Sequence, residues 1–310
     1  MIRATLGLLV AIGLTACSLD DRSDGSTPTP SEPASEAGFV TPLPDIFDCV
    51  RENGGVFLAA HRGGPKPGFP ENTLETMIEA YENGIRVFEI DVQTSSDGIL
   101  YLLHDNTLSR TTTGRARADE ESWETISRLS TIDQEQRVTR INPTKLEDVL
   151  LWAREAGAIV EIDKKPTSGW LDILDMVQST NSANHVILIT YTSEDASYIH
   201  SLAPDLMLSV GLVDNKLPRG VDPRIALAWT GTRSPSPGFW RSLRNRGIEP
   251  LFGTLGRPET RLDDIYLADG NPSEYEDMIE QGLVMLATDR ATELAALLDE
   301  DDQAIGSCLN

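Results

Sequence analysis

The sequence predicts a single (β/α)₈ barrel with a small hairpin insertion after its second strand. Eight apolar, strand-like runs follow residue 54, and amphipathic stretches separate most of them. Such alternation indicates a parallel sheet covered on both faces, and eight units in about 260 residues fit a closed barrel better than an open sheet. The runs are VFLAAH (56–61), RVFEIDV (86–92), AIVEID (158–163), HVILIT (185–190), LMLSVG (206–211), RIALAW (224–229), EPLFGT (249–254) and VMLATD (284–289).

Helical periodicity marks the connections between these strands. The clearest stretches are LETMIEAYENG (74–84), KLEDVLLWAREAG (145–157) and ATELAALLDE (291–300). The first two end at a glycine, which suits the end of a helix. Residues 212–223 carry the weakest helical pattern, so a regular helix is least expected in the fifth crossover.

One segment departs from this alternation and predicts the insertion. After RVFEIDV the chain reads QTSSDGILYLLHDNTLSRTTTG, in which Asp97-Gly98 separates two strand-like runs. Asp-Gly is a strong signal for a two-residue hairpin turn. In such a hairpin the numbers of paired residues add to 195, so Asp91 and His104 would lie opposite each other.

The N-terminal part of the chain predicts an export signal followed by a tether. Residues 1–16, MIRATLGLLVAIGLTA, have one basic residue and an apolar run too short to span a bilayer. With the cysteine that follows, they resemble a bacterial lipoprotein signal in which Cys17 is lipidated. An ordinary secretory signal cut nearby is the alternative. Residues 17–45 are rich in Ser, Pro, Thr and acids and predict a disordered linker, which leaves 46–310 for the barrel.

This layout predicts an exported protein that a lipid holds on a bacterial envelope membrane, facing the periplasm or the cell surface. Ser18 after the lipidated cysteine favours the outer membrane in a cell that has one. The formal net charge of −23 argues against partners such as nucleic acid and against adhesion to anionic lipid. Membrane association would therefore come from the anchor alone, and the sequence does not indicate an oligomeric state.

Polar residues gather where the first three strands end. Barrel enzymes place their sites at the C-terminal ends of the strands, and the hairpin returns the chain over the end of the second strand. Glu89 and Asp91 are two residues apart and therefore point to the same face. The residues expected at this mouth are three acids, two histidines and an arginine: His61, Arg62, Glu89, Asp91, His104 and Glu161.

These residue types favour cleavage of a phosphodiester. Three neighbouring carboxylates repel one another unless a cation holds them, and oxygen ligands favour Ca²⁺ or Mg²⁺. Such an ion binds a phosphoryl oxygen as a Lewis acid, and two histidines beside it can act as base and acid. An arginine suits phosphate oxygens. One divalent cation, Ca²⁺ or Mg²⁺, is therefore the expected cofactor.

The order of these residues resembles the glycerophosphodiester phosphodiesterase family. The resemblance covers residues 56–298. It is carried by His61-Arg62-Gly63, Pro70-Glu71-Asn72-Thr73, Glu89-Ile90-Asp91-Val92, Asp97-Gly98, His104-Asp105, Leu108, Arg110-Thr111-Thr112, Val160-Glu161-Ile162 and Thr288-Asp289-Arg290. It implies a barrel that hydrolyses a small glycerophosphodiester to glycerol 3-phosphate and an alcohol.

By matching position, the resemblance also implies the roles of the site residues. The implied acid/base pair is His61 and His104, and the implied metal ligands are Glu89, Asp91 and Glu161. Arg62 would bind phosphate, unless it only pairs with Glu71. Glu71 would be a further metal ligand, or it would orient Arg62 or the metal.

The third strand departs from the family pattern. The family has a lysine two residues after the third-strand glutamate, and this chain has Asp163 there. Alternation places residues 161, 163 and 165 on one face. Either Lys165 points inward and supplies the cation that binds substrate phosphate, or Asp163 binds the metal or pairs with a lysine.

A late strand departs from the family as well. The family has a tryptophan-centred motif beside the bound alcohol, where this chain reads PLFGTLG (250–256). Phe252 is one candidate for an apolar surface there. Trp170 and Trp229 lie near the ends of other strands and are further candidates for the pocket lining.

The cysteines predict a disulfide. Once Cys17 is lipidated, the remaining two form an even pair in an oxidising compartment. Cys49 precedes the first strand and Cys308 follows the last helix, so both belong to the barrel face opposite the site. We expect a Cys49–Cys308 bond, worth on the order of 4 to 5 kcal/mol in the chain-entropy model and often less in practice.

Two other functions compete with diester hydrolysis. A related barrel phospholipase acting on intact phospholipid would use the same acid/base chemistry, but it would need an exposed apolar rim, and the acidic sequence shows no obvious one. A non-catalytic surface lipoprotein could keep the barrel and bind a ligand. The presence of both histidines and all three acids argues against that alternative.

Overall fold

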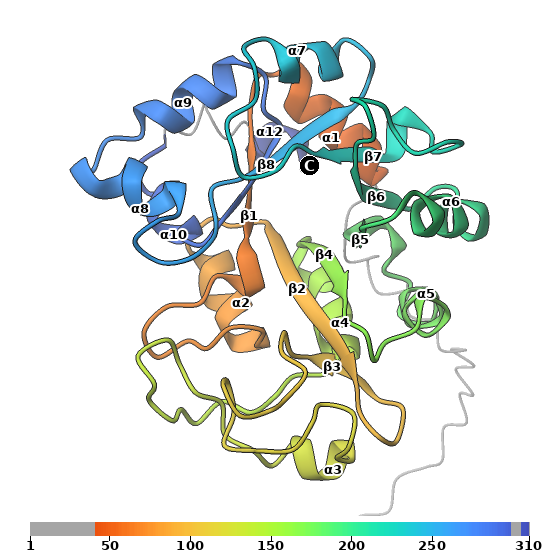
Figure 1. Ribbon diagram of the computed structural model, residues 1–310, viewed down its shortest axis with the longest axis vertical. Coiled ribbons are helices and arrows are strands. Elements are labelled where there is room, and N and C mark those ends of the chain that lie inside the picture. Colours follow the sequence, from red (N-terminus) through yellow and green to blue (C-terminus); the bar gives the residue numbers. More distant parts are fainter. Residues whose placement is uncertain (1–40, 299–304, 310) are drawn as a thin grey trace, which may run out of the picture. The chain divides into compact units, whose positions relative to one another are not determined.

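Eight parallel strands form a closed ring, which confirms the predicted barrel (Figure 1). The ring closes because β1 pairs with β2 on one side and with β9 on the other. Around the ring the order is β1, β9, β8, β7, β6, β5, β4 and β2. The strands are β1 (Phe57–Ala60), β2 (Val87–Thr94), β4 (Ile159–Lys164), β5 (Val186–Thr190), β6 (Met207–Gly211), β7 (Ala226–Trp229), β8 (Glu249–Gly253) and β9 (Met285–Thr288).

The computed structural model describes residues 41–298 and 305–309, all within one compact unit of residues 37–310. The predicted signal peptide, Cys17 and nearly all of the linker lie outside the described residues. Within the described part, no helix is long and apolar enough to cross a membrane.

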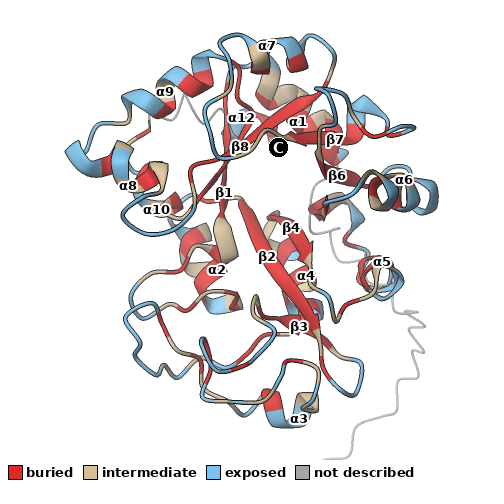
Figure 2. Cartoon of the chain, in the orientation of Figure 1, coloured by how far each residue is buried: buried red, intermediate tan, exposed pale blue. Residues whose placement is uncertain are grey.

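Most helices cover the outside of the ring and turn their apolar sides toward it. The helices are α1 (Leu43–Glu52), α2 (Leu74–Glu82), α3 (Trp123–Ile126), α4 (Leu146–Ala156), α5 (Trp170–Ser179), α6 (Ser193–Leu202), α7 (Phe239–Arg244), α8 (Leu262–Tyr266), α9 (Ser273–Glu280), α10 (Ala291–Ala295) and α12 (Ile305–Cys308). Helices α1 and α12 lie instead at the N-terminal end of the ring, and α3 belongs to the insertion (Figure 1). Figure 2 shows exposed residues on the outward sides of helices such as α6 and α9, and buried residues along the strands. The fifth crossover, residues 212–225, has only the 3₁₀ turn Pro223–Ile225, as its weak helical pattern led us to expect.

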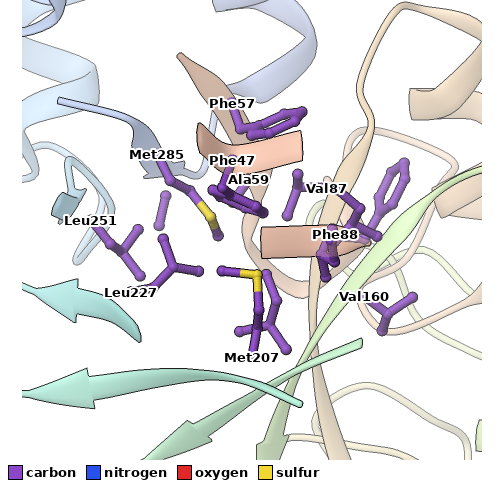
Figure 3. Close-up of a cluster of buried hydrophobic side chains, with 14 of the residues drawn as sticks. Phe47, Phe57, Ala59, Val87, Phe88, Val160, Met207, Leu227, Leu251 and Met285 are labelled. Atoms are coloured by element: carbon purple, nitrogen blue, oxygen red, sulfur yellow. The ribbon is translucent and has the colours of Figure 1, made fainter. Parts of the chain in front are cut away.

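Side chains from β6, β7, β8 and β9 fill part of the barrel interior. Met207, Leu227, Leu251 and Met285 point toward one another in Figure 3, and all four are buried. Helix α1 packs against the N-terminal end of the ring through Phe47, whose ring centroid lies 4.9 Å from that of Phe57. The interior is therefore a packed core, and side chains project into open space only beyond the C-terminal ends of the strands.

The insertion begins with β3 (Leu100–Leu102), which pairs antiparallel with β2 and lies outside the ring. Its register differs by one residue from the prediction, because the turn holds three residues, 96–98, with Gly98 at φ 84°. The backbone carbonyl of Asp91 consequently accepts a hydrogen bond from the Leu103 N–H, so Leu103 lies opposite Asp91 and His104 is the next residue in the chain. The insertion also has its own small buried cluster, made by Tyr101, Leu103, Leu108, Ala118 and Ile126.

The disulfide forms as the sequence predicts. Cys49 in α1 is bonded to Cys308 in α12, and their Cα atoms are 5.7 Å apart. Asn53, one helical turn after Cys49, donates a hydrogen bond from its side-chain amide to the Cys49 carbonyl. The bond joins the two ends of the barrel sequence on the side away from the strands' C-terminal ends.

Candidate active site

A cavity of about 380 Å³ opens at the C-terminal ends of the strands. Its ionisable lining residues are His61, Glu89, Asp91, His104, Glu161, Asp163, Lys165 and Tyr191. Most of the residues predicted from the sequence therefore meet in one place, although they come from β1, β2, β4 and the insertion. Arg62 and Glu71 are the exceptions, since they do not line this cavity.

Three buried carboxylates form the centre of this lining. Oxygen atoms of Glu89, Asp91 and Asp163 all lie within 4.8 Å of one another. Asp91 and Asp163 are direct neighbours in the register of β2 and β4. Burial and the adjacent Asp91 raise the pKa of Glu89 to about 8. Burial opposes ionisation of Asp91 as well, but the charges of Lys165, His104 and Arg62 outweigh it and lower the pKa of Asp91.

The predicted third ligand, Glu161, lies outside this 4.8 Å group but lines the same cavity, so its role as a ligand stays a prediction. It lies on the same face of β4 as Asp163 but two residues earlier, which places it roughly 6 to 7 Å further from the mouth. There it pairs in register with Glu89 and is only 2% exposed. Burial raises its pKa to about 7, and its Oε1 has no hydrogen-bond partner among the described residues.

Lys165 points into the cavity, as one of the two alternatives from the sequence required. Its Nζ lies 2.6 Å from Asp91 Oδ1 and 2.7 Å from Asp163 Oδ2. Burial disfavours the ammonium, but the two carboxylates outweigh that and raise the pKa of Lys165. Asp163 still occupies the position of the family lysine, and Lys165, two residues later, places an ammonium beside it in the cavity.

The loop after β1 holds the carboxylates from one side. Arg62 adopts a left-handed conformation (φ 52°), which turns its backbone N–H toward Glu89 Oε2 at 2.8 Å. Its guanidinium donates to Glu71 at 3.2 Å, and its Nε lies 3.7 Å from Asp91. In this position Arg62 supports two of the carboxylates. Lys165, the other residue predicted to bind substrate phosphate, lines the cavity and can contact the phosphate there.

Glu71 pairs with two arginines, which fits one of its two predicted roles, and its role as a metal ligand stays a prediction. Its oxygens accept hydrogen bonds from Arg110 at 2.7 and 2.8 Å as well as from Arg62. Glu71 therefore orients Arg62, and it connects the barrel loop to the insertion through Arg110.

Asn72 is a site residue that the sequence did not identify. Its Nδ2 donates to Asp91 Oδ2 at 2.7 Å, and its Oδ1 accepts the Asp91 N–H at 2.9 Å. These paired bonds fix the Asp91 carboxylate. They require the left-handed conformation of Asn72 (φ 58°), which asparagine tolerates better than most residues. The Pro-Glu-Asn sequence after a glycine-rich loop was the available signal.

His61 is held by a carboxylate from the last strand. Its Nδ1 lies 2.7 Å from Oδ1 of Asp289, which directly follows β9, the neighbour of β1 in the ring. Burial opposes the imidazolium, but the Asp289 hydrogen bond and the charge of Glu89 outweigh it, so the pKa of His61 is raised. Asp289 is in turn fixed by the Gly256 N–H at 3.0 Å and by Arg261 at 2.9 Å.

His104 has the same arrangement within the insertion. Its Nδ1 lies 2.7 Å from Oδ1 of Asp105, the next residue in the chain. Arg110 binds both oxygens of Asp105, and these hydrogen bonds, with that of His104, lower the pKa of Asp105 to about 2. In both pairs Nδ1 faces a carboxylate, which leaves Nε2 free to face the cavity.

The three aromatic candidates have different positions. Trp229 lines the cavity. Phe252 is fully buried on the outer side of β8, where it packs against Trp240, with ring centroids 5.3 Å apart. Trp170 lies outside the cavity and donates its indole N–H to Asp195. Tyr191, which the sequence did not identify, lines the mouth and donates its hydroxyl to Asp163 at 2.8 Å.

Known sequences that match this chain include glycerophosphodiester phosphodiesterases. The model of the glycerophosphoryl diester phosphodiesterase family matches residues 61–222. The chain is 28% identical over 257 residues to the uncharacterised protein YqiK of Bacillus subtilis, an alignment that covers 79% of this chain and 99% of that protein. It is 45% identical over 71 residues to human glycerophosphodiester phosphodiesterase 1, a match that spans 23% of this chain and 21% of the human protein.

Solved structures share the fold. A glycerophosphoryl diester phosphodiesterase from Parabacteroides distasonis superposes with a TM-score of 0.71 at 22% identity, over 88% of this chain and 94% of that one. A phosphodiesterase from Oleispira antarctica, solved in complex with the product sn-glycerol 3-phosphate, superposes with a TM-score of 0.60 at 18% identity, over 80% and 98% of the two chains. Because the family model covers more than half of the chain, the protein belongs to the glycerophosphoryl diester phosphodiesterase family and is a phosphoric diester hydrolase.

Proposed function

We propose that this enzyme hydrolyses glycerophosphodiesters to glycerol 3-phosphate and an alcohol, with a divalent cation and with His61 and His104 as the acid/base pair. The observation that supports this most directly is the presence of two histidines in the lining of one cavity that also contains a buried group of three carboxylates. Each ring has its Nδ1 hydrogen-bonded to a further carboxylate. The product found in the Oleispira antarctica phosphodiesterase supports the same reaction class by analogy.

The carboxylate group fits a hard divalent cation. Glu89, Asp91 and Asp163 offer only oxygen atoms, which favours Ca²⁺ or Mg²⁺. The raised pKa values of Glu89 and Glu161, and the unpartnered Oδ1 of Asp163 and Oε1 of Glu161, are features that a bound cation would satisfy. When bound, such an ion acts as a Lewis acid on a phosphoryl oxygen.

The remaining chemistry belongs to side chains of this protein. Lys165 lines the cavity and can donate to a phosphate oxygen. His61 and His104 face the cavity through Nε2, so one takes the proton of the attacking hydroxyl and the other gives a proton to the departing alcohol oxygen. If water attacks, glycerol 3-phosphate forms directly. If the hydroxyl on the adjacent glycerol carbon attacks, a cyclic phosphate forms as the alcohol departs, and water then opens the ring in a second step in which the two histidines exchange roles. Each transfer is worth about 10² to 10⁴ in rate.

The test measures release of glycerol 3-phosphate from glycerophosphocholine and glycerophosphoglycerol, before and after chelation. We expect hydrolysis that EDTA abolishes and that Ca²⁺ or Mg²⁺ restores. Intact phosphatidylcholine in micelles is the substrate for the phospholipase alternative. Hydrolysis of that lipid alone would support the alternative, and binding of a diester without turnover would make the protein a ligand-binding lipoprotein.

We also propose that the mature protein is exported and carries a lipid on Cys17, which places the enzyme on an envelope membrane of a bacterial cell. The signal-like residues 1–16 and the polar tether after them support this proposal. Membrane fractionation of wild-type protein and a Cys17→Ser variant tests it. Equal amounts of both variants in the soluble fraction would contradict the lipid anchor.

A further inference from the structure

The cavity has an apolar wall on the side away from its carboxylates. In the order of the ring, β7 and β8 lie across the barrel from β2 and β4. Trp229 at the end of β7 lines the cavity, with Leu251 and Leu255 from β8 and the loop after it. The reacting phosphate belongs near the carboxylates and Lys165, so one arm of a bound phosphodiester extends toward this wall.

Gly253 fixes the position of the Trp229 ring. A Cβ atom built on Gly253 would lie 2.5 Å from Cη2 and 3.2 Å from Cζ3 of Trp229. The indole therefore lies directly against the backbone of β8, in space that any side chain at 253 would need. Gly253 has no positive φ, so room for the ring is its structural reason. Trp229 is thus an anchored aromatic surface at the edge of the cavity.

A second aromatic side chain borders the same cavity. Tyr191 follows β5 and is 74% exposed, and its hydroxyl is held by Asp163. Two aromatic residues from separate strands therefore face a cavity that also contains several acids. Aromatic faces attract cations, with tryptophan the strongest of them.

The charge of the cavity favours a cation at the apolar wall. The lining includes four carboxyl groups, Glu89, Asp91, Glu161 and Asp163, and one ammonium group, Lys165. With a divalent ion bound, the acids ionised and one histidine protonated as the catalytic acid, these charges cancel, and the anionic phosphodiester then leaves one negative charge in excess. The negative charge of the cavity would not stabilise a bound neutral polyol, and it would repel an anionic alcohol.

We propose that Trp229 forms a subsite for a quaternary ammonium group, so that glycerophosphodiesters of choline-like alcohols are the preferred substrates. This inference rests on the proposed function, since it assigns a substrate class to the same site. Trp229 acts as a specificity-determining residue that Gly253 holds in place, and Tyr191 adds a second aromatic face at the mouth.

The decisive measurement separates charge from shape. Glycerophosphocholine is compared with the glycerophosphodiester of 3,3-dimethylbutanol, in which carbon replaces the nitrogen and the size is unchanged. We expect wild-type kcat/KM to favour the choline ester by roughly tenfold. Equal kcat/KM for the two esters would overturn the subsite. Absence of turnover with either ester, or with glycerophosphoglycerol, would instead contradict the proposed function.

Variants then assign the preference to the indole. Trp229→Leu should bring the ratio of kcat/KM for the two esters close to one, and Trp229→Phe should keep part of that ratio. Trp170→Leu is the matched control outside the cavity and should leave the ratio unchanged. A preference that survives in W229L, or an equal loss for both esters, would refute the role of Trp229.

A further variant covers the case in which W229L does not fold. Gly253→Ala keeps the indole but displaces it, because the added Cβ would clash with the ring. It should reduce the choline preference without removing any aromatic group, and thermal unfolding curves would confirm that the protein is folded. An unchanged preference in folded G253A would contradict the anchored aromatic surface.

Discussion

The two histidines reach the same cavity by different routes. His61 belongs to the barrel, and its partner Asp289 is 228 residues away, brought in by closure of the ring between β1 and β9. His104 belongs to the insertion, and its partner Asp105 is the next residue. The Asp289 side chain is 12% exposed and that of Asp105 is 28% exposed. The barrel pair therefore depends on the whole fold, and the insertion pair depends on local structure that water reaches more easily.

The two pairs are mechanically connected through Glu71. This carboxylate accepts hydrogen bonds from Arg62 in the barrel loop and from Arg110 in the insertion. Arg110 also holds Asp105, and Arg62 supports Glu89 through its backbone. Movement of the insertion relative to the barrel would therefore disturb His104 first and the carboxylate group next.

Loss of either imidazole should have the largest effect. His61→Ala and His104→Ala should each lower kcat by about 10² to 10⁴, because each histidine carries one of the two proton transfers. The double variant should lose less than the product of the two factors, since the residues act as a unit. Wild-type kcat in either single variant would remove that histidine from the mechanism. Steady-state release of glycerol 3-phosphate measures all three variants.

The carboxylate partners should rank next and should differ from each other. Asp289→Asn should lower kcat by about 100-fold, because an amide in this buried position no longer fixes the tautomer and orientation of His61. Asp105→Asn should cost about tenfold, since its side chain is more exposed and water can replace part of its role. The two losses are compared at saturating substrate. A larger loss in D105N would reverse our ranking of the barrel and insertion pairs.

The pH profile of the Asp289→Asn enzyme identifies the task of His61. Asp289 contributes to the raised pKa of His61, so removal of its charge lowers that pKa. A base must be deprotonated, and a lower pKa then moves the acidic limb of the kcat profile to lower pH. An acid must be protonated, and the alkaline limb then moves to lower pH. A D289N profile with both limbs unmoved would show that His61 performs neither transfer.

The connection through Glu71 should have the smallest effect, seen in stability. Glu71→Gln weakens the ion pairs with Arg62 and Arg110, and we expect a loss of about 1 kcal/mol in the free energy of unfolding that shrinks at high salt. Glu124→Gln is the matched control, because its pair with Arg128 is largely exposed and should contribute close to nothing. Denaturant unfolding of both variants at two salt concentrations makes the comparison. Equal losses in E71Q and E124Q would contradict the connecting role.

The sequence predicted the barrel well because most strands are nearly continuous apolar runs and most helices repeat with helical periodicity. It predicted that the polar residues gather at one end of the barrel, because the C-terminal ends of parallel strands lie at the same edge of the sheet. It did not indicate that Asp163 joins the carboxylates, since alternation places Glu161 and Asp163 on one face and only the register of β2 with β4 shows that Asp163 lies beside Asp91. The hairpin register was wrong by one residue because Asp-Gly lies in a three-residue turn and not a two-residue one.

Other site residues depended on contacts that no local pattern reveals. Asp289 follows the last strand, and only ring closure brings it to His61. Asn72 reaches Asp91 only because its backbone adopts a left-handed conformation within the loop. His104 and Asp105, in contrast, are adjacent in the chain, so their pairing could have been predicted from the sequence alone.

The bond between Cys49 and Cys308 gives the chain the topology of a covalent circle that contains every barrel strand and both histidines. A protease that cuts one surface loop between these cysteines therefore opens the circle without detaching any segment. The nicked enzyme should run as one species on a gel without reductant and as two fragments with it. Release of a fragment from the folded protein would require a second cut within the same circle.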